Sequence, residues 1–399
     1  MVFVGCTGNP DAHCGEGGDQ APYVVVDTLP TAFAEKPFVT LDVDSERYFL
    51  TVPAVRAAGR TGTDWATAAA SPHSAVPNSP KASTGAASTG DDLKVPFEEV
   101  YVASNASDTS GSINAKLSQG LHVVLSPGVY RLEGALLLNT ENQVLLGLGF
   151  ATLVSANGEP CVAVGDVSGV RVAGILFQAG PEPTDALLVV GTAASFPGDP
   201  NNPVVLSDVF ARVGGPDGPN GVAQAESMVV VKCGHVVGDN LWLWRADHTA
   251  GGAPVTDGWF PVDHGLVVRQ GADDVSMYGL ACEHTLSDLA VWDGDRGKTY
   301  FYQSELPYDA TQALFGDPGF VGYRVGANVT SHQGYGIGVY SYFRDFEVNV
   351  ETGISAPESA TFDSPFSVFL NGYGGIKHVL NDQGNATGLD AAGQAYVCN

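Results

Sequence analysis

The feature that most constrains the fold of this chain is a series of short strand-like runs separated by turn-forming residues. The runs are rich in valine, leucine, isoleucine and aromatic residues, and glycine, asparagine or aspartate interrupts them. Examples are "QVLLGLG", "GVRVAGILF" and "VVGDNLWLW", at residues 143–149, 169–177 and 236–244. Helical periodicity is nearly absent, so the pattern predicts an all-β fold.

The spacing of these runs indicates how the strands are arranged. Similar runs return at intervals of roughly 25–40 residues with loops of varying length, which favours the coils of a parallel β-helix. Gly147, Gly174 and Gly279 would then occupy equivalent tight corners, where a residue without Cβ fits best. A β-sandwich is the competing interpretation, but Asn-Gly hairpin dipeptides between strands are scarce.

Composition divides the chain into three parts. Residues 1–56 are β-rich and are interpreted as an inter-domain segment. Residues 57–92 are dominated by alanine, serine, threonine, glycine and proline, which predicts a low-complexity linker. Residues 93–399 hold most of the strand-like runs, and we expect them to form the β-helix domain with the functional residues.

The charge balance excludes several classes of partner. The chain has 18 Lys+Arg against 44 Asp+Glu and a formal net charge of −26. Nucleic acid, anionic membrane surfaces and anionic polysaccharides would be repelled, because binding them requires a positive surface. No run reaches the 18 or more apolar residues of a membrane span. A neutral polysaccharide or oligosaccharide is the expected partner, and the oligomeric state stays open.

The first residues and the cysteines give weaker indications. "MVFVGCTGNPDAHCG" has no basic region and too short an apolar run for a signal peptide, so we interpret the chain as part of a longer protein. Cys6 and Cys14 flank a turn-rich loop and could form a local disulfide. A zinc site at these cysteines and His13 lacks a suitably spaced fourth ligand. We expect no metal and no cofactor.

Two glutamates are the candidate catalytic residues. Glu283 in "LACEH" and Glu305 in "YQSEL" are 22 residues apart, about one β-helix coil. Adjacent coils are about 4.8 Å apart, so the two carboxylates would be neighbours and the pKa of one would rise. A carboxylic acid protonated near neutral pH is what a glycosidase needs. Alternatively, Glu283 bonds a loop backbone and Glu305 pairs with Arg296 or Lys298.

The segment "WLWRADH" is the candidate sugar-binding surface. Trp242 and Trp244 alternate along one run, so both indoles would lie on one face of a strand. Arg245, Asp247 and His248 follow and could hydrogen-bond to sugar hydroxyls. The alternative is a core tryptophan pair beside a structural Arg–Asp bridge.

Three segments together carry a resemblance to a known family. They are "DNLWLWRADH", "YGLACEHTLSDLAVWDGDRGKTYFYQSELPYD" and "GYGIGVYSYF". With them the chain resembles family 55 of the glycoside hydrolases, over most of residues 122–384. The resemblance implies exo-acting β-1,3-glucanases that invert the anomeric centre and contain two tandem right-handed parallel β-helices of the pectin-lyase-like type. The chain would correspond to the second β-helix, with its first residues similar to the junction.

The resemblance also implies residue roles. Glu305 would be the general acid and Glu283 a second active-site acid. The surrounding substrate-binding residues would be Trp242, Trp244, Arg245, Asp247, His248, His284, Trp292, Tyr302, Gln303 and Tyr308. Carboxyl groups about 5 Å apart are usual for retaining enzymes, whereas inverting enzymes hold them about 6.5–9.5 Å apart. The family resolves this by positioning its water through a relay of glutamine and serine residues in the first β-helix.

Three functions follow from these observations. The first is a secreted, extracellular glycoside hydrolase that cleaves laminarin-like β-1,3-glucan with inversion. The second is a non-catalytic carbohydrate-binding β-helix. The third, a polysaccharide lyase, would need a basic residue near the acidic pair, and the segment offers only Arg296 and Lys298.

Overall fold

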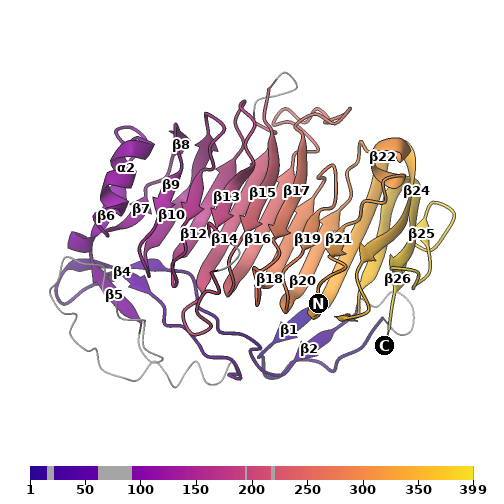
Figure 1. Cartoon of the computed structure of the whole chain (residues 1–399), viewed down its shortest axis with the longest axis horizontal. Helices are drawn as coiled ribbons and strands as arrows, with labels where there is room; N and C mark the ends of the chain where they lie inside the picture. Colours follow the sequence, from indigo (N-terminus) through magenta and orange to yellow (C-terminus); the bar gives the residue numbers. More distant parts are fainter. Residues whose placement is uncertain (16–21, 62–91, 194–195, 217–220, 399) are drawn as a thin grey trace.

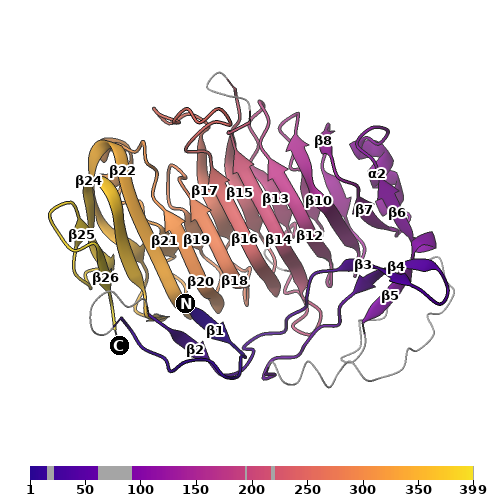
Figure 2. The same cartoon turned by 180° about the vertical axis from the view of Figure 1, so that it is seen from behind.

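The chain folds as a long stack of parallel strands wound into a β-helix (Figures 1 and 2). The computed structural model describes residues 1–15, 22–61, 92–193, 196–216 and 221–398. Within these ranges each strand of the stack pairs in parallel mainly with the strand two places later, so successive coils lie directly on one another. The predicted parallel β-helix is confirmed and the β-sandwich alternative is wrong. Most of the predicted linker, 57–92, lies outside the described residues.

Two series of strands alternate along the chain. The short strands form one face and are β9 (Leu136–Leu138), β11 (Val162–Val164), β13 (Ala186–Val190), β15 (Ala225–Val231), β17 (Val262–Val268), β19 (Ala290–Trp292) and β21 (Tyr323–Val325). The long strands are β10 (Val144–Ser155), β12 (Arg171–Gln178), β14 (Val204–Val213), β16 (Val236–Arg245), β18 (Ser276–Glu283), β20 (Gly297–Glu305), β22 (His332–Ser355) and β24 (Phe366–Leu380). Valine and leucine side chains from both series fill the interior.

A left-handed residue bends most of the long strands into two faces. Gly174 (φ 66°) and Gly279 (φ 71°) occupy this corner in β12 and β18, as predicted. Asp208, Asn240 and Phe301 take the same conformation in β14, β16 and β20. Gly147 does not have a positive φ, but a Cβ there would collide with the carbonyl oxygen of Gly174 in the next coil. The residues after the corner form the face that carries the candidate site.

A helix covers one end of the stack. The first coil contains β6 (Val100–Ala103), α2 (Ser110–Leu117), β7 (His122–Leu125) and β8 (Val129–Leu132). Thr109 caps α2 through its side chain, which accepts from the backbone N–H of Ser112. Ile113 and Leu117 of α2 are buried in the main core, so the helix shields the first coil from water.

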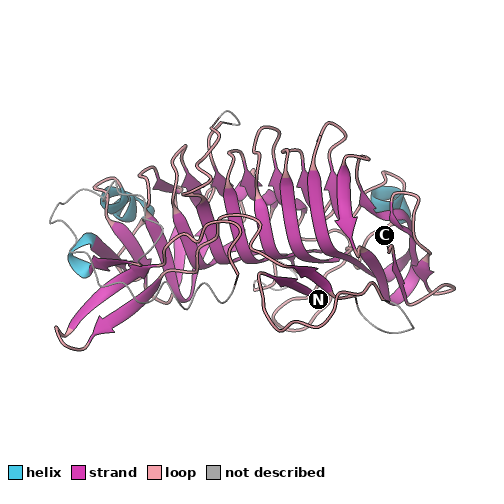
Figure 3. Cartoon of the chain, turned by 90° about the horizontal axis from the view of Figure 1, so that it is seen from below, coloured by secondary structure: helices cyan, strands magenta, loops and turns pink. Residues whose placement is uncertain are grey.

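The first part of the chain packs along the outside of the β-helix (Figure 3). β1 (Val2–Val4) pairs with β2 (Val24–Val26), and β3 (Phe38–Asp42), β4 (Arg47–Val52) and β5 (Leu93–Pro96) form an antiparallel sheet. The segment runs from the end near β22 and β24 to the end near α2 (Figures 1 and 2). No described helix is long and apolar enough to cross a membrane.

A disulfide joins the two ends of the chain. Cys14 is bonded to Cys398, which follows β26 (Gln394–Tyr396). The expected local bridge between Cys6 and Cys14 is therefore wrong, and Cys6 is exposed without a disulfide. The sequence could not indicate this pairing because cysteines distant in sequence become neighbours only when the fold brings the termini together. The remaining elements are β23 (Ala360–Asp363), β25 (Thr387–Gly388), η1 (Phe97–Glu99) and the π-helical turn η2 (Gln312–Gly316).

Candidate active site

The register of the coils places Glu283 and Glu305 directly opposite each other. They are the last residues of β18 and β20, and their Cα atoms are partners across the two strands. The same outward row continues through adjacent coils as Gln178, Arg212, Trp244, Glu283, Glu305 and Tyr340. Adjacent parallel strands lie about 4.8 Å apart, so the two glutamates are immediate neighbours.

Glu283 is held in a largely buried position. It is 9% exposed, and the indole Nε1 of Trp242 donates a hydrogen bond of 2.7 Å to its Oε2. Burial, with further repulsion from Glu305 and Asp247, raises the pKa of Glu283 to about 7, and the Trp242 hydrogen bond opposes only part of this. The alternative, a hydrogen bond between Glu283 and a loop backbone, is wrong, because the donor to Glu283 is the Trp242 side chain.

Glu305 is more accessible and contacts aromatic and histidine side chains. Its side chain is 18% exposed, and the Tyr308 hydroxyl donates to its Oε2. The alternative pairing with Arg296 is wrong, because Arg296 donates to Asp274 at 2.7 Å. Lys298 lies at the opposite end of β20 from Glu305. Among the described residues, no arginine or lysine forms an ion pair with either glutamate.

His284 lies beneath the acidic pair and not at the surface. Its Nε2 is 4.0 Å from Oε2 of Glu305 and 4.0 Å from Oδ1 of Asp247. Burial lowers the pKa of His284 to about 4, so the imidazole is neutral at neutral pH. Its ring packs edge-on against Tyr308, with centroids 4.3 Å apart. His284 therefore supports Glu305 and Tyr308 from the protein interior.

Asp247 connects the tryptophan pair to the same cluster. Its Oδ1 accepts from Trp244 Nε1 at 3.2 Å and lies 2.9 Å from Nδ1 of the exposed His248. The rings of Trp242 and Trp244 are 5.8 Å apart, and Trp242 is 45% exposed. The alternative of a core tryptophan pair is therefore wrong. Gln303, two residues before Glu305, is half-buried and points outward from β20.

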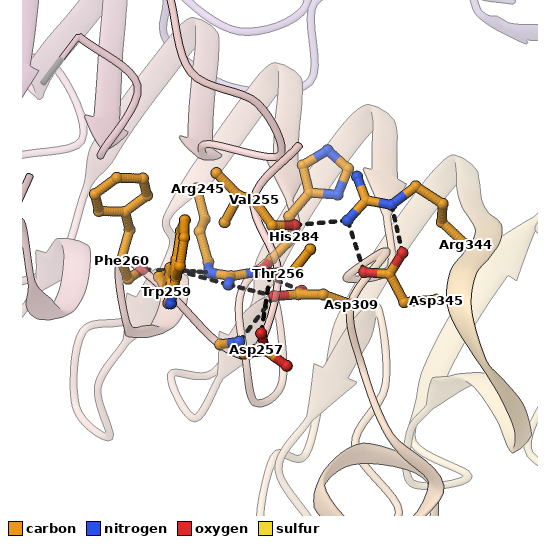
Figure 4. Close-up of polar contacts among 11 residues, drawn as sticks. Arg245, Val255, Thr256, Asp257, Trp259, Phe260, His284, Asp309, Arg344 and Asp345 are labelled. Carbon is orange, nitrogen blue, oxygen red and sulfur yellow. Dashed lines mark hydrogen bonds and ion pairs between the residues drawn. The ribbon is translucent and has the colours of Figure 1, made fainter. Parts of the chain in front are cut away.

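Arg245 is a structural residue and not a substrate contact (Figure 4). Its side chain is 1% exposed, and its guanidinium binds both carboxylate oxygens of Asp309 at 2.8 and 2.9 Å. It also donates to three backbone carbonyls, those of Trp259, Phe260 and His284. Burial opposes ionisation of Asp309, but Arg245 outweighs it and lowers the pKa of Asp309. The alternative of a structural bridge between Arg245 and the Asp247 of the same segment is wrong, because Arg245 pairs with Asp309.

Two other predicted substrate contacts lie in the core. Trp292 and Tyr302 are fully buried. The Tyr302 hydroxyl donates to the carbonyl of Gly322 at 2.6 Å. Neither side chain can reach a ligand at the surface, so both assignments are wrong. Side chains alternate along β20: Gln303 and Glu305 point outward, so Tyr302 and Ser304 point inward.

Sequence reasoning did not assign a role to Asp309. The residue stands next to Tyr308 in "ELPYD", and its partner Arg245 is 64 residues earlier. A fully buried arginine is usually paired, but only the fold selects the partner. No group of histidine, cysteine, aspartate and glutamate suited to a metal ion occurs among the described residues.

The fold and the outward glutamates define the class of the protein: it is a parallel β-helix protein with a carboxylate pair on one face. Residues 100–305 match the LAM55 pectate lyase-like domain. This match covers more than half of the chain, and the protein belongs to that family.

Individual relatives agree with this assignment. The chain is 36% identical to an exo-beta-1,3-glucanase of Streptomyces sp. (strain SirexAA-E / ActE), across 98% of the chain and 59% of the relative. It thus spans less than two thirds of that relative's length. The solved structure of sacteLam55A from Streptomyces sp. SirexAA-E matches with a TM-score of 0.83 and 34% identity, covering 100% of this chain and 67% of that one. A variant of sacteLam55A in complex with glucose matches with a TM-score of 0.82 and 33% identity, with the same coverage.

Proposed function

We propose that the protein is a glycoside hydrolase that cleaves β-1,3-glucan. The observation that carries the proposal is the direct register of Glu283 and Glu305 on an outward face beside the exposed Trp242. Paired carboxylates flanking a glycosidic bond are the usual machinery of glycosidases. The exo-beta-1,3-glucanase relative supports the same reaction and suggests the substrate. The net charge of −26 fits a neutral glucan better than an anionic polymer, and it disfavours the lyase alternative.

Within the pair, we assign Glu305 as the general acid. It is the more exposed of the two carboxylates, so it can approach the oxygen of a leaving group. Tyr308 holds Oε2 of Glu305, which assigns Oε1 to the substrate. Burial, with repulsion from Glu305 and Asp247, raises the pKa of Glu283 to about 7. Glu283 is therefore assigned as a second acid of the site, next to the proton donor.

The stereochemical part of the proposal is inversion. Glu283 and Glu305 are Cα partners on adjacent strands, which lie about 4.8 Å apart, whereas the carboxyl groups of a typical inverting pair are about 6.5–9.5 Å apart. Glu283 is consequently not assigned as the base that activates water. Time-resolved NMR of the first glucose released distinguishes the anomers. An α-product from the β-linked substrate supports inversion, and a β-product contradicts it.

We also propose that the protein acts outside the cytoplasm. The disulfide between Cys14 and Cys398 supports this, because such bonds persist mainly in oxidising compartments. Polymeric glucan is also too large to enter cells, so a hydrolase acting on it would work at the cell exterior.

The test is glucose release from laminarin by the purified chain and by a Glu305→Gln variant. We expect the variant to lose activity by roughly 10²–10⁴-fold, the usual contribution of a general acid. Glu133→Gln is the matched control, because Glu133 is exposed and directly follows β8, at the α2 end of the β-helix and several coils from the pair. Equal activity of parent and Glu305→Gln would overturn the assignment. Laminarin binding without hydrolysis by the parent would replace the proposal with a carbohydrate-binding function.

A further inference from the structure

The strand next to Glu305 contains a bulge. β22 pairs with β20, which carries Glu305, and its pairing with β24 shifts register between Phe343 and Val348. Residues 344–347 of β22 lie there opposite Tyr373 alone. Extra residues of this kind bend a strand and redirect its side chains. The side chains of the bulge therefore do not follow the regular in-and-out alternation of the coils.

Arg344 is the first residue of this bulge, and hydrogen bonds fix its side chain (Figure 4). Its Nε and Nη2 donate to Oδ1 and Oδ2 of Asp345 at 2.7 and 2.8 Å. Its Nη2 also donates to the backbone carbonyl of the buried Val255 at 2.6 Å. The side chain is only 20% exposed. Because Asp345 balances its charge within the bulge, the guanidinium adds little net charge next to the glutamates.

The bulge contacts Tyr308 through both its backbone and its ring. The Tyr308 carbonyl accepts from the backbone N–H of Arg344 at 3.0 Å. The Arg344 guanidinium lies 5.9 Å from the centre of the Tyr308 ring, within the range of a cation–π contact. His284 and Tyr342 pack edge-on against the same ring, with centroids 4.3 and 4.7 Å away. These contacts together orient the hydroxyl that donates to Glu305.

The Val255 contact connects the bulge to the loop that begins with Asp247. The backbone N–H of Val255 donates to the Asp247 carbonyl at 2.8 Å, and that of Thr249 donates to the Ala253 carbonyl at 2.9 Å. The loop is therefore a tight turn with its own hydrogen bonds. Arg344 binds the end of this turn, so its guanidinium is anchored on the side away from β22.

We propose that Arg344 is a positioning residue of the carboxylate site, which holds Tyr308 in the orientation in which its hydroxyl binds Glu305. The inference rests on the proposed function for the reaction that this orientation serves. In the described structure Arg344 pairs with Asp345 and with neither glutamate, so it acts through Tyr308. A planar guanidinium can bind a carboxylate and a carbonyl at its edge while an aromatic ring lies near its face, which an ammonium cannot do.

A double-mutant cycle tests this inference. The kcat and KM for laminarin are measured for the parent, Arg344→Met, Tyr308→Phe and the double variant. Arg344→Met should lower kcat about tenfold, since a misplacement of about 1 Å can cost up to about 10²-fold in rate. KM should change less than about twofold, because the interaction is one that serves the transition state. In the Tyr308→Phe background the same substitution should lower kcat less than about threefold, since no hydroxyl remains to be oriented.

Arg296→Met is the matched control, because Arg296 also pairs with an aspartate but lies at the opposite end of β20 from Glu305. It should change neither constant. An equal loss of kcat from Arg344→Met in both backgrounds would overturn the inference, because the effect would then be independent of the Tyr308 hydroxyl. An unchanged kcat in the single variant would overturn it as well.

A measurement without turnover separates this inference from the proposed function. In protein with ¹³C-labelled tyrosine rings, the NMR signal of Tyr308 is identified as the one lost in Tyr308→Phe. Arg344→Met should shift or broaden this signal, and Arg296→Met should leave it unchanged. If the parent does not hydrolyse laminarin but the Tyr308 signal responds, the proposed catalysis fails and the positioning by Arg344 stands. If hydrolysis requires Glu305 but neither kcat nor the Tyr308 signal responds to Arg344→Met, the reverse holds.

Discussion

Two pairs of side chains occupy neighbouring positions on the same segments, and the pKa of a carboxyl group is raised in one pair and lowered in the other. Glu283 and Glu305 face outward, and only neutral donors, Trp242 and Tyr308, hydrogen-bond to them in the described structure. Arg245 and Asp309, each next to a residue of the outward site, are buried and bind each other through two hydrogen bonds. The pKa of Glu283 is raised and that of Asp309 is lowered.

The contrast shows that the residues that stabilise the fold differ from the residues proposed to carry out the reaction. A guanidinium beside Glu283 would favour the ionised form of this carboxyl group and lower its pKa. Arg245 instead points inward, where it connects β16 to the segment that carries Tyr308 and Asp309. The cation fixes the backbone around the acids without changing their charge through direct contact. The predictions below test each half of this arrangement.

The largest expected effect comes from breaking the buried pair. Arg245→Met leaves the Asp309 carboxylate buried without its partner, so the free energy of unfolding should fall by about 3–5 kcal/mol. Urea denaturation followed by circular dichroism measures this loss. Arg296→Met is the control, because Arg296 and Asp274 form an exposed pair whose loss should cost less than about 1 kcal/mol. Similar losses in the two variants would contradict the structural role of Arg245.

A smaller effect, with a defined pH dependence, is expected for Glu283→Gln. The folded-state pKa of about 7 exceeds the unfolded value of about 4.5, so the folded protein binds more protons between these values. Stability associated with Glu283 is present at acidic pH and is lost as the pH rises to 7. The variant should therefore be more stable than the parent by roughly 1–3 kcal/mol at pH 8 and nearly equal at pH 4.

Unfolding curves of both proteins at the two pH values test this prediction. Asp309 has the opposite dependence: its pKa is lowered, so the stability it contributes is lost as the pH falls below 4. A stabilisation by Glu283→Gln that is the same at pH 4 and pH 8 would show that packing, and not ionisation, causes it.

The smallest expected effect comes from removing the hydrogen bond between Tyr308 and Glu305. Tyr308→Phe keeps the ring against His284 but removes the hydroxyl that donates to Glu305. If the proposed hydrolysis holds, kcat should fall about tenfold with KM nearly unchanged, since a hydrogen bond to a charged group is worth about 1.5–3 kcal/mol.

Tyr342→Phe is the matched control, because its ring packs against Tyr308 with centroids 4.7 Å apart, in the same aromatic cluster. A purely structural role for Tyr308 would lower the melting temperature of Tyr308→Phe without lowering kcat at constant KM, and that result would reject its function at Glu305.

The sequence predicted the parts of this molecule that depend on repetition. Strand runs returning at similar intervals gave the parallel β-helix, and the separation of Glu283 and Glu305 gave their register, because one coil step fixes the distance between equivalent residues. Gly174 and Gly279 were predicted as corners because a residue without Cβ adopts a positive φ at little cost.

The sequence did not predict features that depend on which face a residue occupies or on distant contacts. Trp292 and Tyr302 resemble sugar-binding aromatics by residue type, and only their inward direction places them in the core. Arg245 could have been paired with either Asp247 or Asp309, and the choice requires the position of a segment 64 residues later. The Cys14–Cys398 bond depends on the whole stack, which brings the two termini together.

That bond turns most of the polypeptide into a covalent ring. A single peptide cleavage anywhere between Cys14 and Cys398 leaves the two resulting pieces attached to each other while the disulfide is intact. The inner coils also pair through backbone hydrogen bonds with the coils on both sides, so cleavage of one loop leaves this pairing in place. A protease would therefore have to cut twice, or act together with a reductant, before any part of the protein could diffuse away.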